Sequence, residues 1–440
     1  MKHSSKSINR RQAISLLGGA AATTFVPVRS ANESMSATGY LFSAGDEAFL
    51  EDLQRRACLF FWDQGSPTTG QVLDRARNDL PVGTRDPRKM ASIAATGFGL
   101  TALCIADRRG YLPHSQIVER VRNTLDWHLN HFQHQHGFYY HFTDIETGAP
   151  FPGTEVSSID TSLLLCGVLT ARAYFSDAKI HSMASQIYER VDWPWMQNGA
   201  PAFSMGWHPK EGFLNARWEH YCELMMIYLL AIGSPTHPVP PITWKAFSRP
   251  TIEYAGFKYV SGNDPIFTHQ YSQAWFDFRN KHDQYADYFE NSIKAMRAHK
   301  AFCLSMPKWY SEDYWGISAS DYAKGYTAWG GPPLQGPVDG TVVPCAAGGS
   351  LAFVPADCLH VLRAMQAKWG KRAWGRYGFV DAFHPAADWY DADVLGIDQG
   401  ITVIMAENLR SGLIWDTFMR NPEAADAMKK AGFLTGKFPN

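Results

Sequence analysis

Apolar residues recur at i, i+3 and i+4 spacing in long segments of the chain, which is the spacing of helices that bury one face. We expect a helix in each of nine segments: 46–63, 90–109, 114–132, 158–175, 178–191, 218–232, 284–304, 355–370 and 398–420. A short β-hairpin is expected around Phe257–Val260, and strands elsewhere are expected to be minor.

Long linkers rich in Gly, Pro and Trp separate these helices, and linkers of such length in a compact domain are usually functional. The longest are 64–88, 192–216, 233–283 and 306–352. The alternation predicts an all-α fold, the (α/α)6 toroid or double helical barrel, with long loops and at most minor β-hairpins. A flat solenoid is the alternative, but no repeat of fixed period supports it. We expect a cleft walled by the loops 64–88, 192–216, 257–283 and 306–345.

Composition adds that the chain is globular, because 45% of its 440 residues are hydrophobic and 14% are aromatic. Nothing in it marks a second domain, so 36–440 is expected to be one catalytic unit. Acidic residues exceed basic ones beyond residue 30, which gives no reason to expect a nucleic-acid partner. The oligomeric state is left open.

Residues 1–31 have the order of a signal peptide: basic residues, then a diluted apolar run, then small residues. The pair Arg10 and Arg11 before the apolar run is typical of a twin-arginine signal, and an ordinary secretory signal is the alternative. The run is too short for a stable membrane anchor. We expect a periplasmic or secreted protein.

Neither the cysteines nor the histidine-rich run in residues 128–142 indicates a metal site. The seven cysteines are scattered without a CxxC pair, which favours buried free thiols over disulfides or zinc ligands. The run HLNHFQHQHGFYYHF holds five histidines, but only the first two share a helix face, so a solvated helix end is expected. Neither a phosphate-binding loop nor a GxSxG serine-hydrolase elbow occurs.

Aromatic residues cluster in the linkers beside Asp, Arg and His, which favours a cleft that binds sugar rings. Packing under long loops is the alternative for any single tryptophan. The aromatic candidates for substrate contact are Trp207, Trp218, Trp275, Trp315, Tyr326 and Trp329.

Two carboxylate sites are the candidates for chemistry. Glu155 and Asp160 precede and begin an apolar helix, so Asp160 is expected at the helix N-terminus facing the cleft, with a capping role as the alternative. Glu219 and Glu223 are four residues apart and are expected on one helical face. Glu223 leads into an almost wholly apolar stretch, and desolvation there would raise its pKa, as suits a general acid. A buried ion pair is the alternative.

Further polar residues are candidates for substrate contact. Arg217 and His220 lie beside Glu219 in the sequence and are also possible ion-pair partners of Glu223. Four aspartates lie in Gly-rich settings that indicate tight turns near a surface; they are Asp313, Asp321, Asp339 and Asp398.

Motifs throughout this chain resemble the bacterial glycoamylase-like family, whose members include β-1,2-glucanases and a domain of cyclic β-1,2-glucan synthases. The motifs include FFWDQ, VLDRAR, SIAATGFGLTAL, EVSSIDTSLLL, HYCELMMIYLLAIGSPTHPVP, WGISASDYAKGY and GIDQGITVIMAENLRSGLIW. The resemblance implies the (α/α)6 toroid and places catalytic carboxylates at Glu223 and Asp160. It departs at Cys222, beside the expected acid, where Asn or Ser is usual.

The sequence therefore predicts a glycoside hydrolase with paired carboxylates, and the resemblance implies that it cleaves a β-glucan, expected to be β-1,2-linked, by inversion. No metal or organic cofactor is expected, and the partner is an oligo- or polysaccharide. A transglycosylase of the same fold and a non-catalytic carbohydrate-binding protein are the alternatives. Product analysis separates hydrolysis from transfer, and retention of both carboxylates argues against pure binding.

Overall fold

The computed structural model describes residues 34–262, 265–333 and 336–439. The expected signal segment, 1–31, lies outside the described residues. In the described part of the chain, no helix combines the length and apolar character needed to cross a bilayer.

The described chain is mostly helical. Its α-helices are α1 (Ala44–Asp63), α2 (Ile93–Arg109), α3 (His114–Asn130), α4 (Ser158–Tyr174), α5 (Ala178–Glu189), α6 (Trp193–Gln197), α7 (Met225–Gly233), α8 (Tyr271–Trp275), α9 (Tyr288–Leu304), α10 (Pro344–Gly348), α11 (Pro355–Ala373), α12 (Gly396–Arg410), α13 (Leu413–Phe418) and α14 (Pro422–Lys430). Seven of the expected helices appear with ends shifted by a few residues. The segment expected as 398–420 is two helices, because Gly412 adopts a left-handed conformation with φ of 71° between them.

Strands are two to four residues long but more numerous than expected. They are β1 (Ser34–Met35), β2 (Leu41–Phe42), β3 (Val72–Leu73), β4 (Arg75–Arg77), β5 (Met90–Ser92), β6 (His134–Gln135), β7 (Phe138–Tyr139), β8 (Phe142–Asp144), β9 (Val156–Ser157), β10 (Gly206–His208), β11 (Gly212–Phe213), β12 (Thr251–Tyr254), β13 (Phe257–Val260), β14 (Lys281–His282), β15 (Ala319–Tyr322), β16 (Gly325–Ala328), β17 (Trp374–Gly375), β18 (Gly378–Phe379), β19 (Phe383–His384), β20 (Trp389–Tyr390), β21 (Asp393–Leu395) and β22 (Leu434–Thr435). The expected hairpin is confirmed, because β12 pairs with β13.

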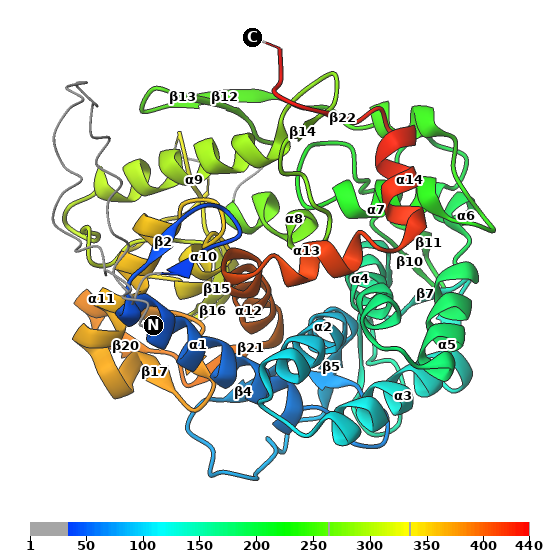
Figure 1. The fold of residues 1–440 in the computed structure, drawn as a ribbon, viewed down its shortest axis with the longest axis horizontal. Coiled ribbons are helices and arrows are strands. Elements are labelled where there is room, and N and C mark those ends of the chain that lie inside the picture. The colour runs from blue at the N-terminus through cyan, green and yellow to red at the C-terminus, as the bar shows by residue number, and fades with distance from the viewer. Residues whose placement is uncertain (1–33, 263–264, 334–335, 440) are drawn as a thin grey trace, which may run out of the picture.

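Three helices with apolar residues on every side form the centre of the molecule. Residues 93–106 of α2 are all buried, as are residues 158 and 160–172 of α4, and α12 is similarly enclosed (Figure 1). Two glycines permit the contact between α2 and α4: a Cβ atom on Gly97 would lie 2.3 Å from the Leu163 carbonyl oxygen, and one on Gly167 would lie 2.1 Å from the Gly97 oxygen. These backbones therefore pack more closely than larger residues would permit.

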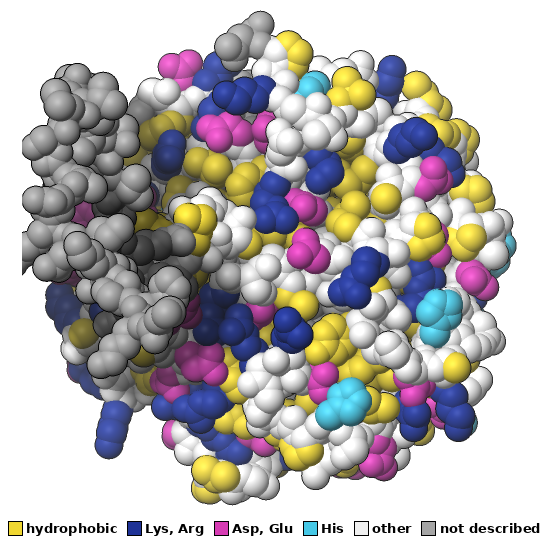
Figure 2. Space-filling view, viewed as in Figure 1, with side chains coloured by type: hydrophobic (Ala, Val, Ile, Leu, Met, Phe, Trp, Pro, Cys, Tyr) yellow, Lys and Arg dark blue, Asp and Glu magenta, His cyan; other side chains and the backbone are white. Residues whose placement is uncertain are grey.

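The helices around this centre are amphipathic. Among the residues of α3, those buried are Ile117, Val121, Thr124, Leu125 and His128, which recur at three- and four-residue spacing. Figure 1 shows α1, α3, α5, α9 and α11 at the periphery, with α2, α4 and α12 between them. On the face in Figure 2, acidic and basic side chains are interspersed among scattered hydrophobic ones.

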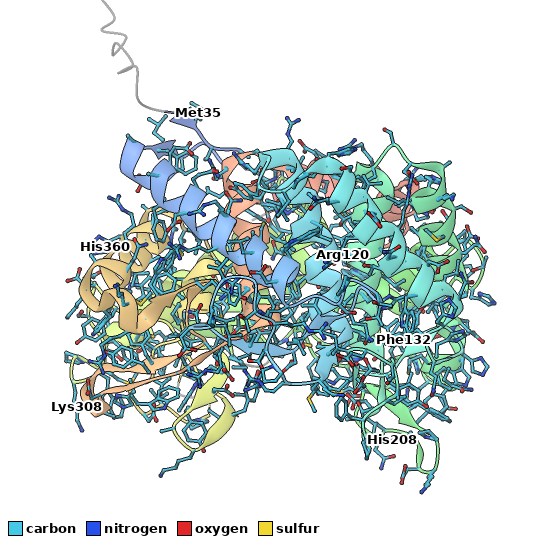
Figure 3. The ribbon with its side chains drawn as sticks, turned by 90° about the horizontal axis from the view of Figure 1, so that it is seen from below. Met35, Arg120, Phe132, His208, Lys308 and His360 are labelled. Atoms are coloured by element: carbon cyan, nitrogen blue, oxygen red, sulfur yellow. The ribbon has the colours of Figure 1, made fainter. Side chains whose placement is uncertain are left out.

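The buried helices bring their N-terminal ends towards one region, where short strands and loops gather. Ser92 caps α2 and Ser157 caps α4, each by accepting a hydrogen bond from a backbone amide of its helix's first turn. In Figure 3, His208 at the end of β10 and the loop residue Lys308 lie at one end of the molecule, away from Met35.

Candidate active site

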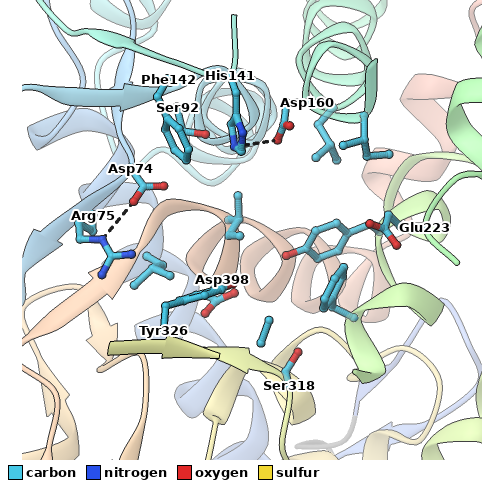
Figure 4. Close-up of a pocket in the computed structure, with 17 residues that line it drawn as sticks. Asp74, Arg75, Ser92, His141, Phe142, Asp160, Glu223, Ser318, Tyr326 and Asp398 are labelled. Carbon is cyan, nitrogen blue, oxygen red and sulfur yellow. Dashed lines mark hydrogen bonds and ion pairs between the residues drawn. The ribbon is translucent and has the colours of Figure 1, made fainter. Parts of the chain in front are cut away.

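A pocket of ≈ 330 Å³ lies at the N-terminal ends of the buried helices α2, α4 and α12 (Figure 4). Its polar lining consists of Asp74, Arg75, Ser92, His141, Asp160, Glu223, Ser318, Tyr326 and Asp398. Its apolar lining consists of Phe142, Ile159, Leu163, Phe267, Tyr271, Ala319, Leu395 and Ile397. Helix N-termini carry partial positive charge, so the first turns of α2, α4 and α12 favour anionic groups at this position.

Asp160 lies in the first turn of α4 and is not itself the helix cap. Ser157 is the cap: its hydroxyl accepts from the Asp160 amide at 3.2 Å and donates to Asp160 Oδ2 at 2.5 Å. Asp160 is 8% exposed and its carboxylate lines the pocket. Ser157, and not Asp160, therefore caps the helix. One oxygen of Asp160 remains available for other contacts.

His141 lies between two carboxylates and joins them. Its Nδ1 is 2.9 Å from Glu155 Oε1, and its Nε2 is 3.4 Å from Asp160 Oδ1. Burial opposes the charged imidazolium, but the negative charges of Asp160 and Glu155 outweigh it and raise the pKa of His141 to about 9. At neutral pH, His141 is therefore a cation that holds Asp160 as its anionic partner.

This placement corrects the expectation for the histidine run. His141 lines the pocket, and His128 is fully buried with its Nδ1 2.7 Å from the Thr124 carbonyl, so neither belongs to a solvated helix end. The spacing of the run did not reveal this, because His141 precedes β8 and meets Glu155 from another loop.

Glu223 lies in a turn just before α7, and not on a helix. The expected helix 218–232 begins only at Met225, so Glu219 and Glu223 do not share a helical face. The chain from 217 to 224 instead makes isolated bridges and bends, including a pairing of His220 with Ser248. The backbone carbonyl of Glu223 is fixed by the Ser272 hydroxyl at 2.6 Å.

The Glu223 carboxyl group faces the pocket without a cationic partner. Burial raises the pKa of Glu223 to about 7, the Cys222 thiol donates a hydrogen bond that opposes the shift, and the charge of Asp160 adds to it. Among the described residues, no Lys, Arg or His forms an ion pair with Glu223, although Arg217 and His220 were considered for that role. Glu223 thus carries its proton at a higher pH than an exposed glutamate.

Asp398 and Arg75 complete the charged lining. Asp398 is 6% exposed and lies in the first turn of α12 beside Asp381, rather than in a surface turn. Burial raises the pKa of both Asp381 and Asp398, and their proximity favours one shared proton. Arg75 binds Asp74 at 3.1 Å and Asp321 at 2.5 Å, which places Asp321 behind the pocket wall.

The expected tryptophans do not line this pocket. Trp275 and Trp315 are fully buried, and Trp218 and Trp329 are nearly so. Three of them donate their indole N–H inward: Trp218 to Ser158, Trp275 to Thr101 and Trp329 to Ser320. Trp207 on β10 packs on Trp195. These large side chains fill the space beneath the long loops. Tyr326, which was an expected candidate, does line the pocket, and the other aromatic lining residues are Phe142, Phe267 and Tyr271.

The remaining polar candidates also lie outside the pocket lining. Arg217 donates to the carbonyls of Gln197 and Ala202 and so holds its own loop. His220 contacts Ser248, Asp313 contacts His360 at the surface, and Asp339 accepts from the Thr341 amide. The loop 192–216, expected to wall the cleft, contributes no lining residue among those described, because its β10–β11 hairpin pairs with β9 beside the pocket.

Sequence reasoning missed Asp74, Arg75, Ser92, His141 and Asp381. Asp74 and Arg75 lie in VLDRAR, one of the motifs that carried the family resemblance, so that motif could have identified them. No motif or residue spacing around Asp381 marked it as a site residue.

Two groups of side chains place ligand atoms close enough to hold a metal ion. One is His141, Glu155 and Asp160, and the other is Asp321, Asp381 and Asp391. In the first group both ring nitrogens of His141 face carboxylates, and a protonated imidazole is not a metal ligand. The contacts of His141 with Glu155 and Asp160 therefore fit a triad of ion-paired side chains better than a metal site.

A pocket that holds one carboxyl group of raised pKa and a second, ion-paired carboxylate has the pair of carboxyl groups that glycoside hydrolases use. Comparison with known proteins agrees. The model of the glycoamylase family, described as "Putative glucoamylase", matches residues 215–422. A crystal structure of a Bacteroides fragilis protein with that same description is 30% identical, covers 89% of this chain and 98% of its own, and superposes with a TM-score of 0.81. The chain belongs to the glycoamylase family of glycoside hydrolases.

Two further relatives have more specific descriptions. An endo-β-1,2-glucanase from Chitinophaga pinensis, solved with sophorotriose and glucose, is 28% identical, with 89% of this chain and 99% of that chain covered and a TM-score of 0.82. An exo β-1,2-glucooligosaccharide sophorohydrolase from Parabacteroides distasonis is 27% identical over 92% of this chain. The chain spans 60% of the length of that sophorohydrolase.

Proposed function

We propose that this protein hydrolyses β-1,2-linked glucan by an inverting single displacement, with Glu223 as general acid and Asp160 as the carboxylate that activates water. The observation that carries the proposal is that one pocket holds a buried, cation-free carboxyl group and a carboxylate paired with a cation. Acid and base catalysis requires two titratable groups whose surroundings give them different pKa values.

Glu223 supplies the proton for the leaving oxygen. With a pKa near 7, a large fraction of Glu223 is protonated at neutral pH, whereas an ordinary exposed glutamate is almost fully ionised. Transfer of its proton to the glycosidic oxygen, directly or through a water or a sugar hydroxyl, leaves an uncharged alcohol as leaving group.

Asp160 accepts the proton of the attacking water. The imidazolium of His141 lies 3.4 Å from one oxygen of Asp160, and Ser157 fixes the second oxygen, so the carboxylate is oriented before substrate binds. Water then attacks the anomeric carbon from the face opposite the leaving group, and the configuration at that carbon inverts. Asp398 is less suited to this role because it shares a proton with Asp381.

The β-1,2 linkage is supported by the two relatives that act on β-1,2-glucans. The pocket is near the lower end of the ~300–1,000 Å³ range of small-molecule sites and suits a short saccharide segment rather than a whole polymer. Phe142, Phe267, Tyr271 and Tyr326 offer ring faces for sugar stacking. We further propose that the helices complete the (α/α)6 toroid, that 36–440 is one unit, and that residues 1–31 direct export.

The test compares Glu223→Gln on two substrates. On β-1,2-glucan the variant should lose about 10²- to 10⁴-fold in kcat, whereas on a β-configured oligosaccharide fluoride, whose leaving group needs no proton, most of the rate should remain. Equal losses on both substrates, or near wild-type cleavage of glucan, would refute the assignment. Asp313→Asn, at an exposed aspartate outside the pocket, is the control for expression and folding.

Inversion has its own measurement. NMR of the first product should show the α-anomer before mutarotation, because a single displacement at a β-linkage inverts the anomeric carbon. A first product in the β-configuration would require a two-step, retaining mechanism. Reducing-end assays on a panel of glucans should show cleavage of the β-1,2-linked one, and exclusive cleavage of another linkage would refute the substrate.

Export is tested separately. The secreted chain should begin near residue 31, and changing Arg10 and Arg11 to Lys should stop its export if the signal is of the twin-arginine type. Undiminished export of this variant would refute that type of signal.

A further inference from the structure

A second cavity, of ≈ 610 Å³, lies outside the pocket that holds Glu223 and Asp160. It forms where the loop after β4 meets the C-terminal end of α11, the β17–β18 hairpin and the link between β20 and β21. The two cavities share no lining residue. Small-molecule sites have volumes of ~300–1,000 Å³, so this second cavity is large enough to hold a ligand of its own.

Two aromatic side chains line the second cavity, and buried neighbours hold both of them in place. Trp374 packs on Phe379 with ring centroids 4.7 Å apart, and Tyr390 stacks on Phe383 with centroids 5.6 Å apart and 4° between the ring planes. Trp374 and Tyr390 are themselves only partly buried. Fixed aromatic rings with exposed surface suit the apolar faces of sugar rings.

The charged lining of the second cavity is balanced. Three cations and three carboxylates contribute to it: Lys371, Arg372, Arg376, Asp79, Asp388 and Asp391. Arg372 pairs with Asp388 at 2.7 Å, and Arg376 pairs with Asp63 at 2.5 Å. Because two of the cations already have anionic partners, the cavity is poorly suited to a phosphate or another anion. A neutral ligand whose hydroxyl groups both donate and accept hydrogen bonds matches such a lining.

A two-stranded ladder joins the second cavity to the substrate pocket. β4 pairs with β21, and the paired residues Arg75 and Leu395 line the substrate pocket. Beyond the other end of the ladder, the Asn78 amide donates to the Ala392 carbonyl at 2.8 Å, and both residues line the second cavity. Three residues of extended chain span about 10 Å. A short oligosaccharide is long enough to cover this distance.

We propose that the second cavity is an accessory binding site for glucan, which holds one segment of the chain while another segment occupies the substrate pocket. The ligand class is a neutral saccharide, and its β-1,2 linkage rests on the proposed function. The accessory site takes no part in bond cleavage. It should therefore strengthen the binding of a long chain and leave the cleavage of a short one unchanged.

The test fills the second cavity from an exposed position. Ala392 is exposed, and its carbonyl rather than its side chain contacts Asn78, so Ala392→Tyr should fold normally while the new ring occupies the cavity. Ser115→Tyr is the matched control. Ser115 is also exposed, and it lines a separate cavity of ≈ 500 Å³ beside Asp107, at the end of α2 that lies away from the substrate pocket.

The first measurement compares a long substrate with a short one. On polymeric β-1,2-glucan, Ala392→Tyr should raise KM about two- to tenfold with kcat unchanged, which is the size of one lost aromatic contact. Its KM for the trisaccharide sophorotriose should not change, and Ser115→Tyr should match wild type on both substrates. An unchanged KM for the polymer in Ala392→Tyr, or an equal rise on both substrates, would overturn the proposal.

The second measurement detects binding without cleavage and so separates this proposal from the proposed function. The full chain is labelled with fluorotryptophan, and the fluorine NMR resonance of Trp374 is assigned with Trp374→Phe. Sophorose should shift this resonance in wild type and in Ser115→Tyr, but not in Ala392→Tyr. A wild-type resonance that sophorose leaves unmoved would overturn the accessory site. If the resonance moves as expected while β-1,2-glucan stays intact, the accessory site is supported and the proposed function fails.

Discussion

Two sides of the pocket place carboxyl groups in opposite environments. On the side formed by β4, β8 and α4, Asp160 lies beside the imidazolium of His141 and Asp74 lies beside Arg75. Glu223, in the turn before α7, also lines the pocket (Figure 4). It is buried beside the Cys222 thiol, and among the described residues no Lys, Arg or His pairs with it. Burial raises the pKa of Glu223 to about 7, which suits a proton donor, whereas the contact with His141 orients Asp160 to act on water.

The largest expected effect comes from removing the anionic side. Asp160→Asn should lower kcat by about 10²- to 10⁴-fold, and the loss should extend to the oligosaccharide fluoride, because water must be activated for either leaving group. Added azide needs no base and should restore turnover, with an α-glycosyl azide as product. If Asp160→Asn spares the fluoride as Glu223→Gln is expected to, the two roles have been assigned wrongly.

A smaller effect is expected from removing the cation. His141→Gln deletes the partner of Asp160, and losing interaction worth about one pKa unit corresponds to about tenfold in rate. The imidazolium is lost as the pH rises through the pKa of His141, which is about 9, so the basic limb of the wild-type kcat/KM profile should steepen there and that of His141→Gln should not. His136→Gln is the control, because His136 contacts Asp192 outside the pocket. A uniform fall in kcat/KM with an unchanged basic limb would indicate a purely structural role for His141.

The smallest effect concerns the donor beside Glu223. Cys222→Ser replaces a weak thiol donor with a stronger hydroxyl donor, which stabilises the carboxylate and should lower the pKa of Glu223 by less than about one unit. The basic limb of kcat/KM should move downward accordingly, with little change in the plateau. Movement in the opposite direction would mean that the thiol does not donate to Glu223.

The fold was predictable where packing is local. The spacing of apolar residues located α1 to α5 because each of these helices buries a continuous stripe or its whole surface. It failed at 218–224, where Tyr221 and its neighbours are buried in an irregular segment held by contacts with Ser248. Buried irregular chain and buried helix share the same apolar composition, so periodicity alone could not separate them.

The site was predictable only in part, for a related reason. Glu223 and Asp160 stood out because each precedes an apolar run, and the structure brings both to one pocket. His141 and Asp381 reach their partners across long sequence separations, which a single sequence does not reveal. The prediction that the tryptophans contact substrate was wrong for this pocket, because a large aromatic side chain can pack beneath a loop as well as line a sugar-binding cleft.

The pH dependence follows from the two environments. Because the pKa of Glu223 is raised to about 7, the protonated, donating form predominates below pH 7 and is lost as the pH rises through that value. Activity should therefore fall above about pH 7. The groups that face Glu223 are Asp160, Cys222 and Tyr271, and of these the Asp160 charge holds the pKa up.

The most direct measurement is an infrared titration of the Glu223 carboxyl group in the resting enzyme. The difference between wild-type and Glu223→Gln spectra should contain a protonated-carboxyl band that disappears with a midpoint near pH 7. A carboxyl band that titrates near the ordinary glutamate value of about 4.3 would show that Glu223 is ionised at neutral pH, and would contradict its role as the general acid.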